Sequence, residues 1–137
     1  MQEKKFILVK AKPLISIITL NWNQTEITCQ FLESTRKLLY KHYEVLVCDM
    51  GSAADPPLQI ITGNYPNTRI LKTDPCNDNG VNWAIKQAKG DFILLINNHT
   101  ELTENTLDDL LAPFLTDKIL GVTCARSRCC DRKNEVE

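Results

Sequence analysis

The sequence lacks any apolar run long enough to cross a lipid bilayer. Its longest apolar stretches, residues 14–20 and 92–96, fall far short of the roughly 18–20 residues that a transmembrane helix needs. Near the amino terminus, the apolar run 6–9 stops at Lys10, which is too short for a secretory signal. We therefore expect a cytoplasmic protein without a transmembrane segment, or a soluble part of a larger protein that faces the cytoplasm.

A large net charge is also missing. Sixteen Lys and Arg residues against seventeen Asp and Glu residues give a formal net charge of -1, so the basic surface that nucleic-acid-binding proteins use is not expected. With 43% hydrophobic and 24% charged residues, the composition is that of a folded globular protein rather than a disordered one. A length of 137 residues predicts one domain with a substantial core.

Several well-known functional motifs do not occur in the sequence. There is no G-x-x-x-x-G-K-[ST] loop, and no G-x-G-x-x-G follows the first apolar segment. These absences argue against P-loop hydrolysis and against standard dinucleotide binding. There is also no G-x-S-x-G motif, which counts against an α/β-hydrolase.

The six cysteines are expected to be reduced thiols, because disulfides belong mainly to secreted proteins. Cys29 and Cys48 lie in apolar segments and are typical of small core residues. The Cys-x4-Cys-Cys cluster that begins at Cys124 has no standard zinc spacing.

Apolar segments typical of strands alternate with segments typical of helices. Continuous apolar runs, rich in β-branched residues, predict strands that are buried on both faces. These runs are residues 14–20, 44–48 and 92–96, and residues 68–72 predict a further, weaker strand. Residues 119–125 are a candidate fifth strand.

Helical spacing of apolar residues predicts segments between these strands. The predicted helices lie around residues 27–39, 58–63, 81–88 and 107–114. We expect Asn23 and Thr103 to cap the first and the last of these helices. Gly90 is suited to follow the third helix, and Pro113 should end or bend the last one.

The alternation of strands and helices favours right-handed crossovers and a mainly parallel sheet. We therefore predict a three-layer α/β/α fold, with one domain over residues 1–137 and a core over about 13–125. In such sheets, ligands bind outside the carboxyl ends of the strands. Three polar groups follow apolar strands and should meet at one edge: residues 21–23, 49–52 and 97–100.

Four stretches, taken in order, carry a resemblance to a known family. Residues 15–23 end in Asn-Trp-Asn, 43–52 contain Asp-Met-Gly-Ser, 82–91 contain Asn-Trp-Ala-Ile, and 92–101 contain Asn-Asn-His-Thr-Glu. Together they resemble the nucleotide-binding half of a glycosyltransferase family 2 enzyme of the GT-A fold. The match spans about residues 13–114. The resemblance implies that the acceptor half, with the family's catalytic Asp, is not included, so no catalytic residue is assigned.

The resemblance implies transfer of a sugar from a nucleotide-diphosphate donor (UDP, GDP or dTDP) to a hydroxyl of a glycan or lipid-linked acceptor, with inversion. The nucleotide-binding residues that it implies are Leu20, Asn21, Asn23, Asp49, Gly51, Asn82 and Asn97. Asp49 would accept a hydrogen bond from the base. Asn97 and His99 hold the positions that bind a divalent metal, Mn²⁺ or Mg²⁺, which would neutralise charge on the leaving diphosphate.

Two departures from the family pattern leave other interpretations open. His99 replaces the usual Asp, which favours Mn²⁺ over Mg²⁺ because imidazole suits softer metals. The loop before Asn82 is short, and Ala84 stands where Gly is usual. A second interpretation is therefore a degenerate or truncated nucleotide-sugar-binding module, and a third is an unrelated α/β protein such as a flavodoxin-like domain.

The candidate site residues also have structural interpretations. Asp49 could cap the next turn, and Asn21 and Asn23 could be turn or cap residues. Trp22 and Trp83 are more typical of packing than of stacking on a ligand.

Overall fold

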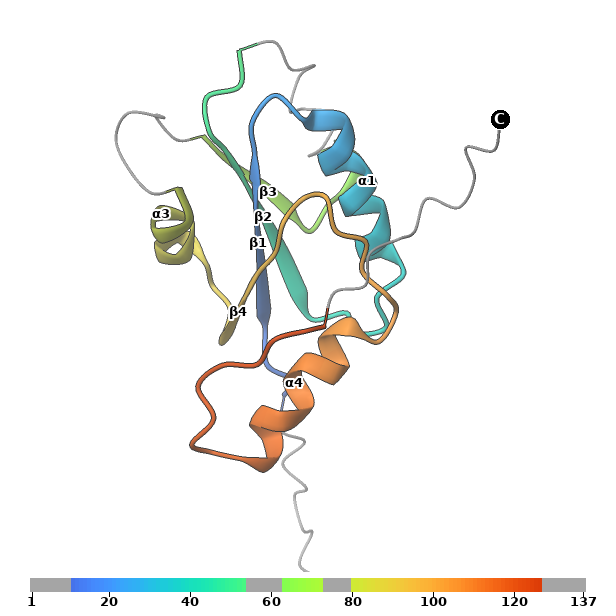
Figure 1. Ribbon diagram of the computed structural model, residues 1–137, viewed down its shortest axis with the longest axis vertical. Helices are drawn as coiled ribbons and strands as arrows, with labels where there is room; N and C mark the ends of the chain where they lie inside the picture. Colours follow the sequence, from blue (N-terminus) through green and yellow to red (C-terminus); the bar gives the residue numbers. More distant parts are fainter. Residues whose placement is uncertain (1–10, 54–62, 73–79, 127–137) are drawn as a thin grey trace, which may run out of the picture.

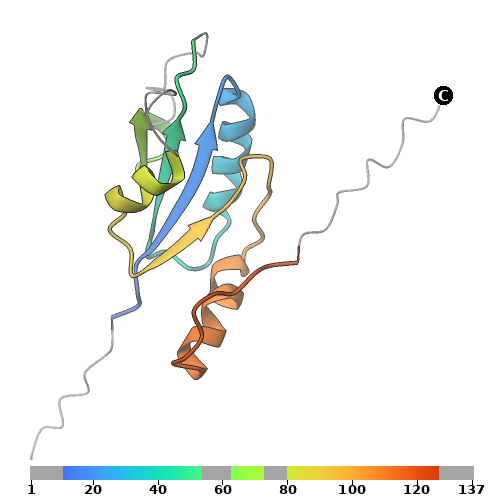
Figure 2. The same cartoon turned by 60° about the vertical axis from the view of Figure 1, so that its left-hand side comes forward.

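Four parallel strands form one sheet in the order β3-β2-β1-β4. The computed structural model describes residues 11–53, 63–72 and 80–126. The strands are β1 (Ile15–Asn21), β2 (Tyr43–Asp49), β3 (Thr68–Lys72) and β4 (Phe92–Leu95). All neighbouring strands are parallel, so their carboxyl ends meet at one edge, which is uppermost in Figures 1 and 2.

Helices cover both faces of the sheet, which confirms the predicted three layers. The helices are α1 (Thr25–Arg36), α3 (Gly80–Gln87) and α4 (Thr106–Thr116). Figure 2 shows α3 on one face and α1 on the other, while α4 lies toward the amino ends of the strands. Among the described residues, no helix has the length and apolar character that a membrane crossing requires.

The sheet separates two apolar cores. The larger core joins the sheet to α1 and α4 through residues such as Ile17, Phe31 and Leu107. The smaller core, formed by Ile18, Leu46, Cys48 and Ala84, lies under α3. Successive residues of a strand point to opposite faces, so a strand between two cores is apolar at almost every position. The four predicted strands are therefore confirmed.

The chain between α3 and β4 passes so close to β1 that only glycine fits at position 90. A Cβ on Gly90 would stand 2.6 Å from the backbone nitrogen of Ser16 and 2.8 Å from the carbonyl oxygen of Phe92. The N–H of Gly90 donates to Oγ of Ser16 over 2.8 Å. Because α3 already ends at Gln87, the close approach to β1, rather than the end of the helix, requires this glycine.

The predicted cap of α1 is wrong. The N-cap is Gln24, whose side chain makes no cap hydrogen bond. Asn23 instead adopts a φ of 49°, and its Oδ1 accepts the N–H of Ala53 over 3.0 Å. A contact with a distant loop thus replaces the local contact that the sequence suggested.

The predicted cap of the last helix is also wrong, and the helix does not end at Pro113. Asn105, not Thr103, is the N-cap of α4, and the helix continues past Pro113 to Thr116. A proline keeps a helical φ and removes one N–H donor, and only a short stretch of α4 follows it.

The candidate fifth strand does not form. Residues 121–126 have no regular structure, and Ile119 and Val122 are 94% and 80% exposed. The predicted helix over 27–39 ends earlier, at Arg36, and Leu39 is 57% exposed. The predicted helix over 58–63 lies almost entirely outside the described residues.

The cysteines that the structure describes are free thiols. Cys48 is buried, Cys29 is partly buried and Cys124 is exposed. The first two pack in or against the cores, as predicted. The other three cysteines lie outside the described residues.

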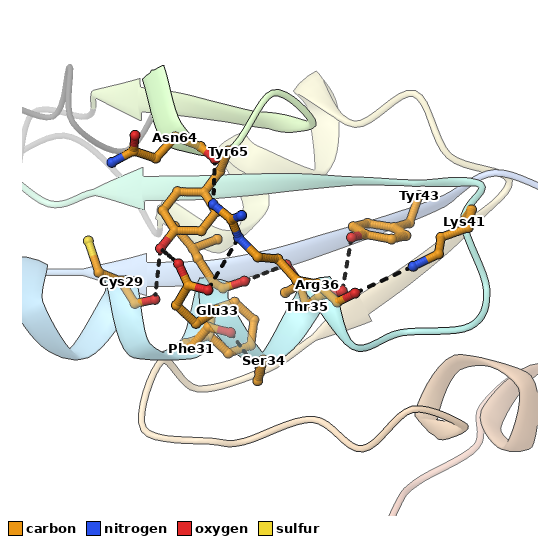
Figure 3. Close-up of polar contacts among 11 residues, drawn as sticks. Cys29, Phe31, Glu33, Ser34, Thr35, Arg36, Lys41, Tyr43, Asn64 and Tyr65 are labelled. Atoms are coloured by element: carbon orange, nitrogen blue, oxygen red, sulfur yellow. Dashed lines mark hydrogen bonds and ion pairs between the residues drawn. The ribbon is translucent and has the colours of Figure 1, made fainter.

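A polar cluster fastens the turn before β3 to α1 (Figure 3). The hydroxyl of Tyr65 donates to Oε1 of Glu33, and Cζ of Arg36 lies 4.8 Å from the centre of the tyrosine ring. Arg36 also donates to the carbonyl oxygen of Asn64 over 2.8 Å. Burial, followed by the contact with Glu33, raises the pKa of Tyr65 to about 12, so its hydroxyl remains a donor at neutral pH.

Tyr65→Phe is expected to lower the free energy of unfolding by about 1 kcal/mol, because the hydroxyl that bonds to Glu33 and to the carbonyl oxygen of Cys29 is lost while the buried ring remains. Tyr65→Ala should lower it by about 3 kcal/mol, because the ring is lost as well. Urea denaturation measures both values. Equal losses in the two variants would contradict this account of the cluster.

Candidate functional site

A hollow of about 490 Å³ opens at the carboxyl edge of the sheet, on the side of α3. Its walls come from the ends of β1 and β4, the turns that follow them and the start of α3. The lining residues are Ile18, Leu20, Trp22, Gln24, Val81, Leu95, Ile96, Asn97, Asn98 and His99. A largely apolar hollow with a few polar groups is typical of small-molecule sites.

A tight turn after β4 carries the polar side of the hollow. Oδ1 of Asn97 accepts the N–H of His99 over 3.1 Å, and the Asn97 carbonyl accepts the N–H of Thr100 over 3.1 Å. Asparagine favours such turns because its side chain bonds to the backbone two residues on. The turn leaves Asn97 and His99 exposed, whereas Asn98 between them is buried.

The polar residues that end β1 and β2 bond to each other. Asn21 and Asp49 are register partners on these strands, and Nδ2 of Asn21 donates to Oδ1 of Asp49 over 3.0 Å. Asn21 is 0% exposed and Asp49 is 4% exposed. Thr28 of α1 donates to Oδ1 of Asn21 over 2.8 Å, which places this pair on the α1 face of the sheet.

Ser52 joins the loops that follow β1 and β2. Its hydroxyl donates to Oδ1 of Asp49 and accepts the N–H of Asn23 over 2.9 Å. Gly51, before it, has a φ of 83°, a conformation that glycine adopts at no steric cost. Sequence reasoning did not single out Ser52, although its place in the Asp-Met-Gly-Ser motif could have done so.

The predicted site residues come to the same edge of the sheet but occupy different environments. Leu20, Asn97 and His99 line the hollow. Asn21 and Asp49 are buried beside it, and Asn23, Gly51 and Asn82 are exposed. The expected convergence of the strand ends is confirmed.

The two tryptophans differ from each other. Trp22 is 66% exposed and lines the hollow, which departs from the packing role expected for it. Trp83 packs against the smaller core, as expected. Val81 also lines the hollow, and no motif pointed to it.

Among the described residues that line the hollow, none carries a carboxylate. Within the described parts of the chain, no cluster of three or more His, Cys, Asp or Glu residues could hold a metal ion. Asn97 and His99 supply one amide oxygen and imidazole nitrogen at the hollow. Of the described residues, these two side chains could hold a cation, and this donor set suits Mn²⁺ better than Mg²⁺.

Comparison with known proteins gives matches along most of the chain. The model of Glycosyl transferase family 2 matches residues 16–137. The O-antigen biosynthesis protein RfbC of Myxococcus xanthus is 27% identical over 122 residues, which are 85% of this chain and 10% of RfbC.

Two solved structures share the arrangement of the strands and helices. TarS of S. aureus, in complex with UDP-GlcNAc, has a TM-score of 0.65 and 27% identity, over 74% of this chain and 31% of that chain. The mannosyltransferase PcManGT from Pyrobaculum calidifontis, in complex with GDP-Man and Mn2+, has a TM-score of 0.71 and 17% identity, over 82% of this chain and 35% of that chain. At that identity, PcManGT supports the fold alone. The chain spans about a tenth of RfbC and about a third of each solved chain.

Proposed function

Because the chain belongs to Glycosyl transferase family 2, we propose that it binds a nucleotide-diphosphate sugar and takes part in transfer of the sugar to an acceptor hydroxyl. Its three layers have the GT-A architecture of the solved glycosyltransferases that it matches. The observation that carries the proposal is the hollow at the carboxyl ends of β1 and β4, with polar turns at its edge. We assign residues 13–125 to the donor-binding domain and no acceptor site to this chain.

The similar proteins support a nucleotide-linked donor. TarS binds UDP-GlcNAc, so UDP is the first donor to test, with GDP and dTDP after it. RfbC is an O-antigen biosynthesis protein, which supports a glycan or lipid-linked acceptor. The proposed place of the reaction is the cytoplasm.

Each part of a nucleoside diphosphate has a matching group at this edge of the sheet. The exposed ring of Trp22 can stack on the face of a base, with Leu20 beside it as an apolar surface. Asp49 is proposed to accept a hydrogen bond from a base N–H, with Asn21 holding its carboxylate. Asn97 and His99 are assigned to the ribose and the diphosphate.

The exposed loop and helix residues complete the proposed donor site. Asn23 and Gly51 are assigned to its rim on the side of β1 and β2, and Asn82 to its rim on α3. All three are exposed, so a donor that extends beyond the hollow could reach their polar groups.

The proposed transfer is inverting and uses a divalent cation that arrives with the donor. In such a transfer, the acceptor hydroxyl gives its proton to a general base and its oxygen bonds to the anomeric carbon as the bond to the nucleoside diphosphate breaks. A bound cation would supply charge neutralisation on the leaving group. His99 and Asn97 would contribute two ligands, and the diphosphate oxygens would contribute the others.

Titration with UDP, GDP, dTDP and FMN, with and without Mn²⁺, tests the proposal through the melting temperature. Binding of UDP or GDP should raise it, since a ligand stabilises the folded state that it binds, and Mn²⁺ should enlarge the effect. Binding that does not depend on Mn²⁺ would favour a metal-independent nucleotide-binding module. Binding of FMN alone would contradict both functions.

His99→Asp is expected to raise the affinity for Mg²⁺ about tenfold in the presence of UDP, because an anionic oxygen replaces a nitrogen ligand. Isothermal titration measures this affinity. His42→Asp is the matched control, since His42 is exposed and contacts the carbonyl oxygen of Lys12, at the opposite edge of the sheet. Equal Mg²⁺ affinities in the native protein and in His99→Asp would count against the metal assignment.

A further inference from the structure

A continuous series of buried hydrogen bonds connects the ends of β4, β1 and β2. Nδ2 of Asn98 donates to Oγ1 of Thr28 over 3.1 Å, and Thr28 donates to Oδ1 of Asn21 over 2.8 Å. Nδ2 of Asn21 then donates to Oδ1 of Asp49 over 3.0 Å. None of these four side chains is more than 5% exposed. We call them the polar chain.

The polar chain permits one arrangement of donors and acceptors. A carboxylate accepts hydrogen bonds, so Asn21 must turn its amide nitrogen to Asp49 and its amide oxygen to Thr28. Thr28 must then donate to Asn21 and accept from Asn98. Only a hydroxyl at position 28 performs both tasks at this size, and the low dielectric of the interior strengthens a fully satisfied series.

The two ends of the polar chain border different parts of the proposed donor site. Asn98 lies between Asn97 and His99, which are assigned to the diphosphate. Asp49, at the other end, is assigned to the base. Thr28 lies on α1, is 0% exposed and does not line the hollow, so it acts only through its neighbours.

We propose, on the basis of the proposed function, that Thr28 is a positioning residue for the donor. Its hydroxyl holds the turn after β4 at a fixed place relative to the ends of β1 and β2. A nucleoside diphosphate must bind Asp49, at the base end of the polar chain, together with the turn after β4, so it gains affinity from this preorganisation. A nucleoside without phosphates binds the base end alone and gains little from it.

The base end has supports that do not depend on Thr28. Ser52 donates to Asp49 through its hydroxyl and through its N–H. The turn after β4 depends more on the polar chain, because Asn98 bonds there to Thr28 and to Oε1 of Gln24. Loss of the Thr28 hydroxyl should therefore disturb the diphosphate end first.

The test compares Thr28→Val, which removes the hydroxyl at constant size, with Thr28→Ser, which keeps it. The affinities for UDP and uridine, and for GDP and guanosine, are measured by isothermal titration with Mn²⁺ present. Thr28→Val should weaken diphosphate binding about tenfold and nucleoside binding by less than about threefold, as expected for lost preorganisation. Thr28→Ser should remain close to the native protein for both. Should valine prevent folding, Thr28→Ala removes the hydroxyl without added bulk.

Ser34→Ala is the matched control for general destabilisation. Ser34 lies on the same helix, is 2% exposed and accepts the N–H of Leu102 over 3.1 Å. It therefore fastens the connection between β4 and α4 to α1 without belonging to the polar chain. Ser34→Ala should lower stability while leaving the ratio of UDP to uridine affinity unchanged.

The outcomes separate this inference from the function on which it rests. If the native protein binds neither UDP nor GDP, the proposed function fails and the inference fails with it. If the native protein binds UDP or GDP, the inference alone is overturned when Thr28→Val leaves both affinities unchanged. It is also overturned when Thr28→Val weakens the affinities for the diphosphate and for the nucleoside equally. A selective loss that Ser34→Ala reproduces would overturn it as well.

Discussion

Replacing Asp49 by alanine is expected to weaken the binding of UDP or GDP by about tenfold to a hundredfold, the range for one hydrogen bond to a charged group. The proposed contact is between the Asp49 carboxylate and an N–H of the base, at the carboxyl end of β2. Isothermal titration of the native protein and the variant measures the loss.

The structure also predicts a loss of stability in this variant. Asn21 loses its carboxylate acceptor, and a buried polar group that loses its partner costs about 1–3 kcal/mol. This loss follows from the structure, in which Asp49 is 4% exposed. Affinities should therefore be measured at a temperature at which both proteins remain folded.

Asp91→Ala is the matched control for Asp49→Ala. Oδ2 of Asp91 accepts the N–H of Leu14 over 2.9 Å, so this carboxylate also fastens strand backbone, but at the amino edge of the sheet. Nucleotide affinity should stay unchanged in Asp91→Ala. An unchanged affinity in Asp49→Ala too would refute the proposed contact with the base.

Replacing Glu44 by alanine is expected to lower the free energy of unfolding by about 2–4 kcal/mol, because several polar groups lose a buried acceptor at once. Oε1 of Glu44 accepts the hydroxyl of Ser16 over 2.7 Å and the N–H of Lys89 over 2.8 Å. Oε2 pairs with Arg69 over 3.0 Å, and the Glu44 side chain is 13% exposed. Urea denaturation measures the loss.

Glu44 connects segments that are distant in the sequence. Ser16 lies on β1, Arg69 lies on β3, and Lys89 precedes β4, whose approach to β1 requires Gly90. Glu101→Ala is the control, because Glu101 pairs with Lys37 while both side chains are more than half exposed. Such pairs add little to stability. Similar melting temperatures for Glu44→Ala and Glu101→Ala would contradict the importance of the Glu44 contacts.

The contribution of Glu44 should be lost in acid. Burial is the largest single influence and raises the pKa of Glu44, but the hydrogen bonds from Lys89, Ser16 and Arg69 together bring the pKa below its ordinary value of 4.5. The stabilisation is therefore present above the unfolded-state pKa and is lost as the pH falls through the lower folded-state pKa. The difference in unfolding free energy between the native protein and Glu44→Gln should therefore shrink as the pH falls below 4.5, the ordinary value of the Glu44 pKa.

The strands were predictable because their signal is local. A strand between two layers of helices is buried on both faces, so residues 14–20 and 92–96 are apolar at nearly every position. The observed strands β1 and β4 lie within one residue of these bounds. The family motifs follow the strands, which is why the convergence at one edge could also be predicted.

The ends of the helices were less predictable, because distant contacts decide them. Asn23 has the chemistry of a helix cap, yet its side chain bonds to Ala53 in the loop after β2. Residues 119–125 have the composition of a strand, but within the described parts of the chain no neighbouring strand pairs with them. Propensity reports what a segment can form, and its neighbours determine what it does form.

By itself, the sequence determined the alternation of strands and helices, the parallel sheet, the resemblance to a sugar-transferring family and the edge at which its polar residues gather. These properties follow from apolar periodicity and from motifs within short segments. Only the tertiary structure decided that Asn21 and Asp49 are buried on the α1 face while Leu20 and His99 line the hollow. It also decided that Thr28 connects Asn98 to Asn21, because strand register and helix packing bring together side chains that no local pattern relates.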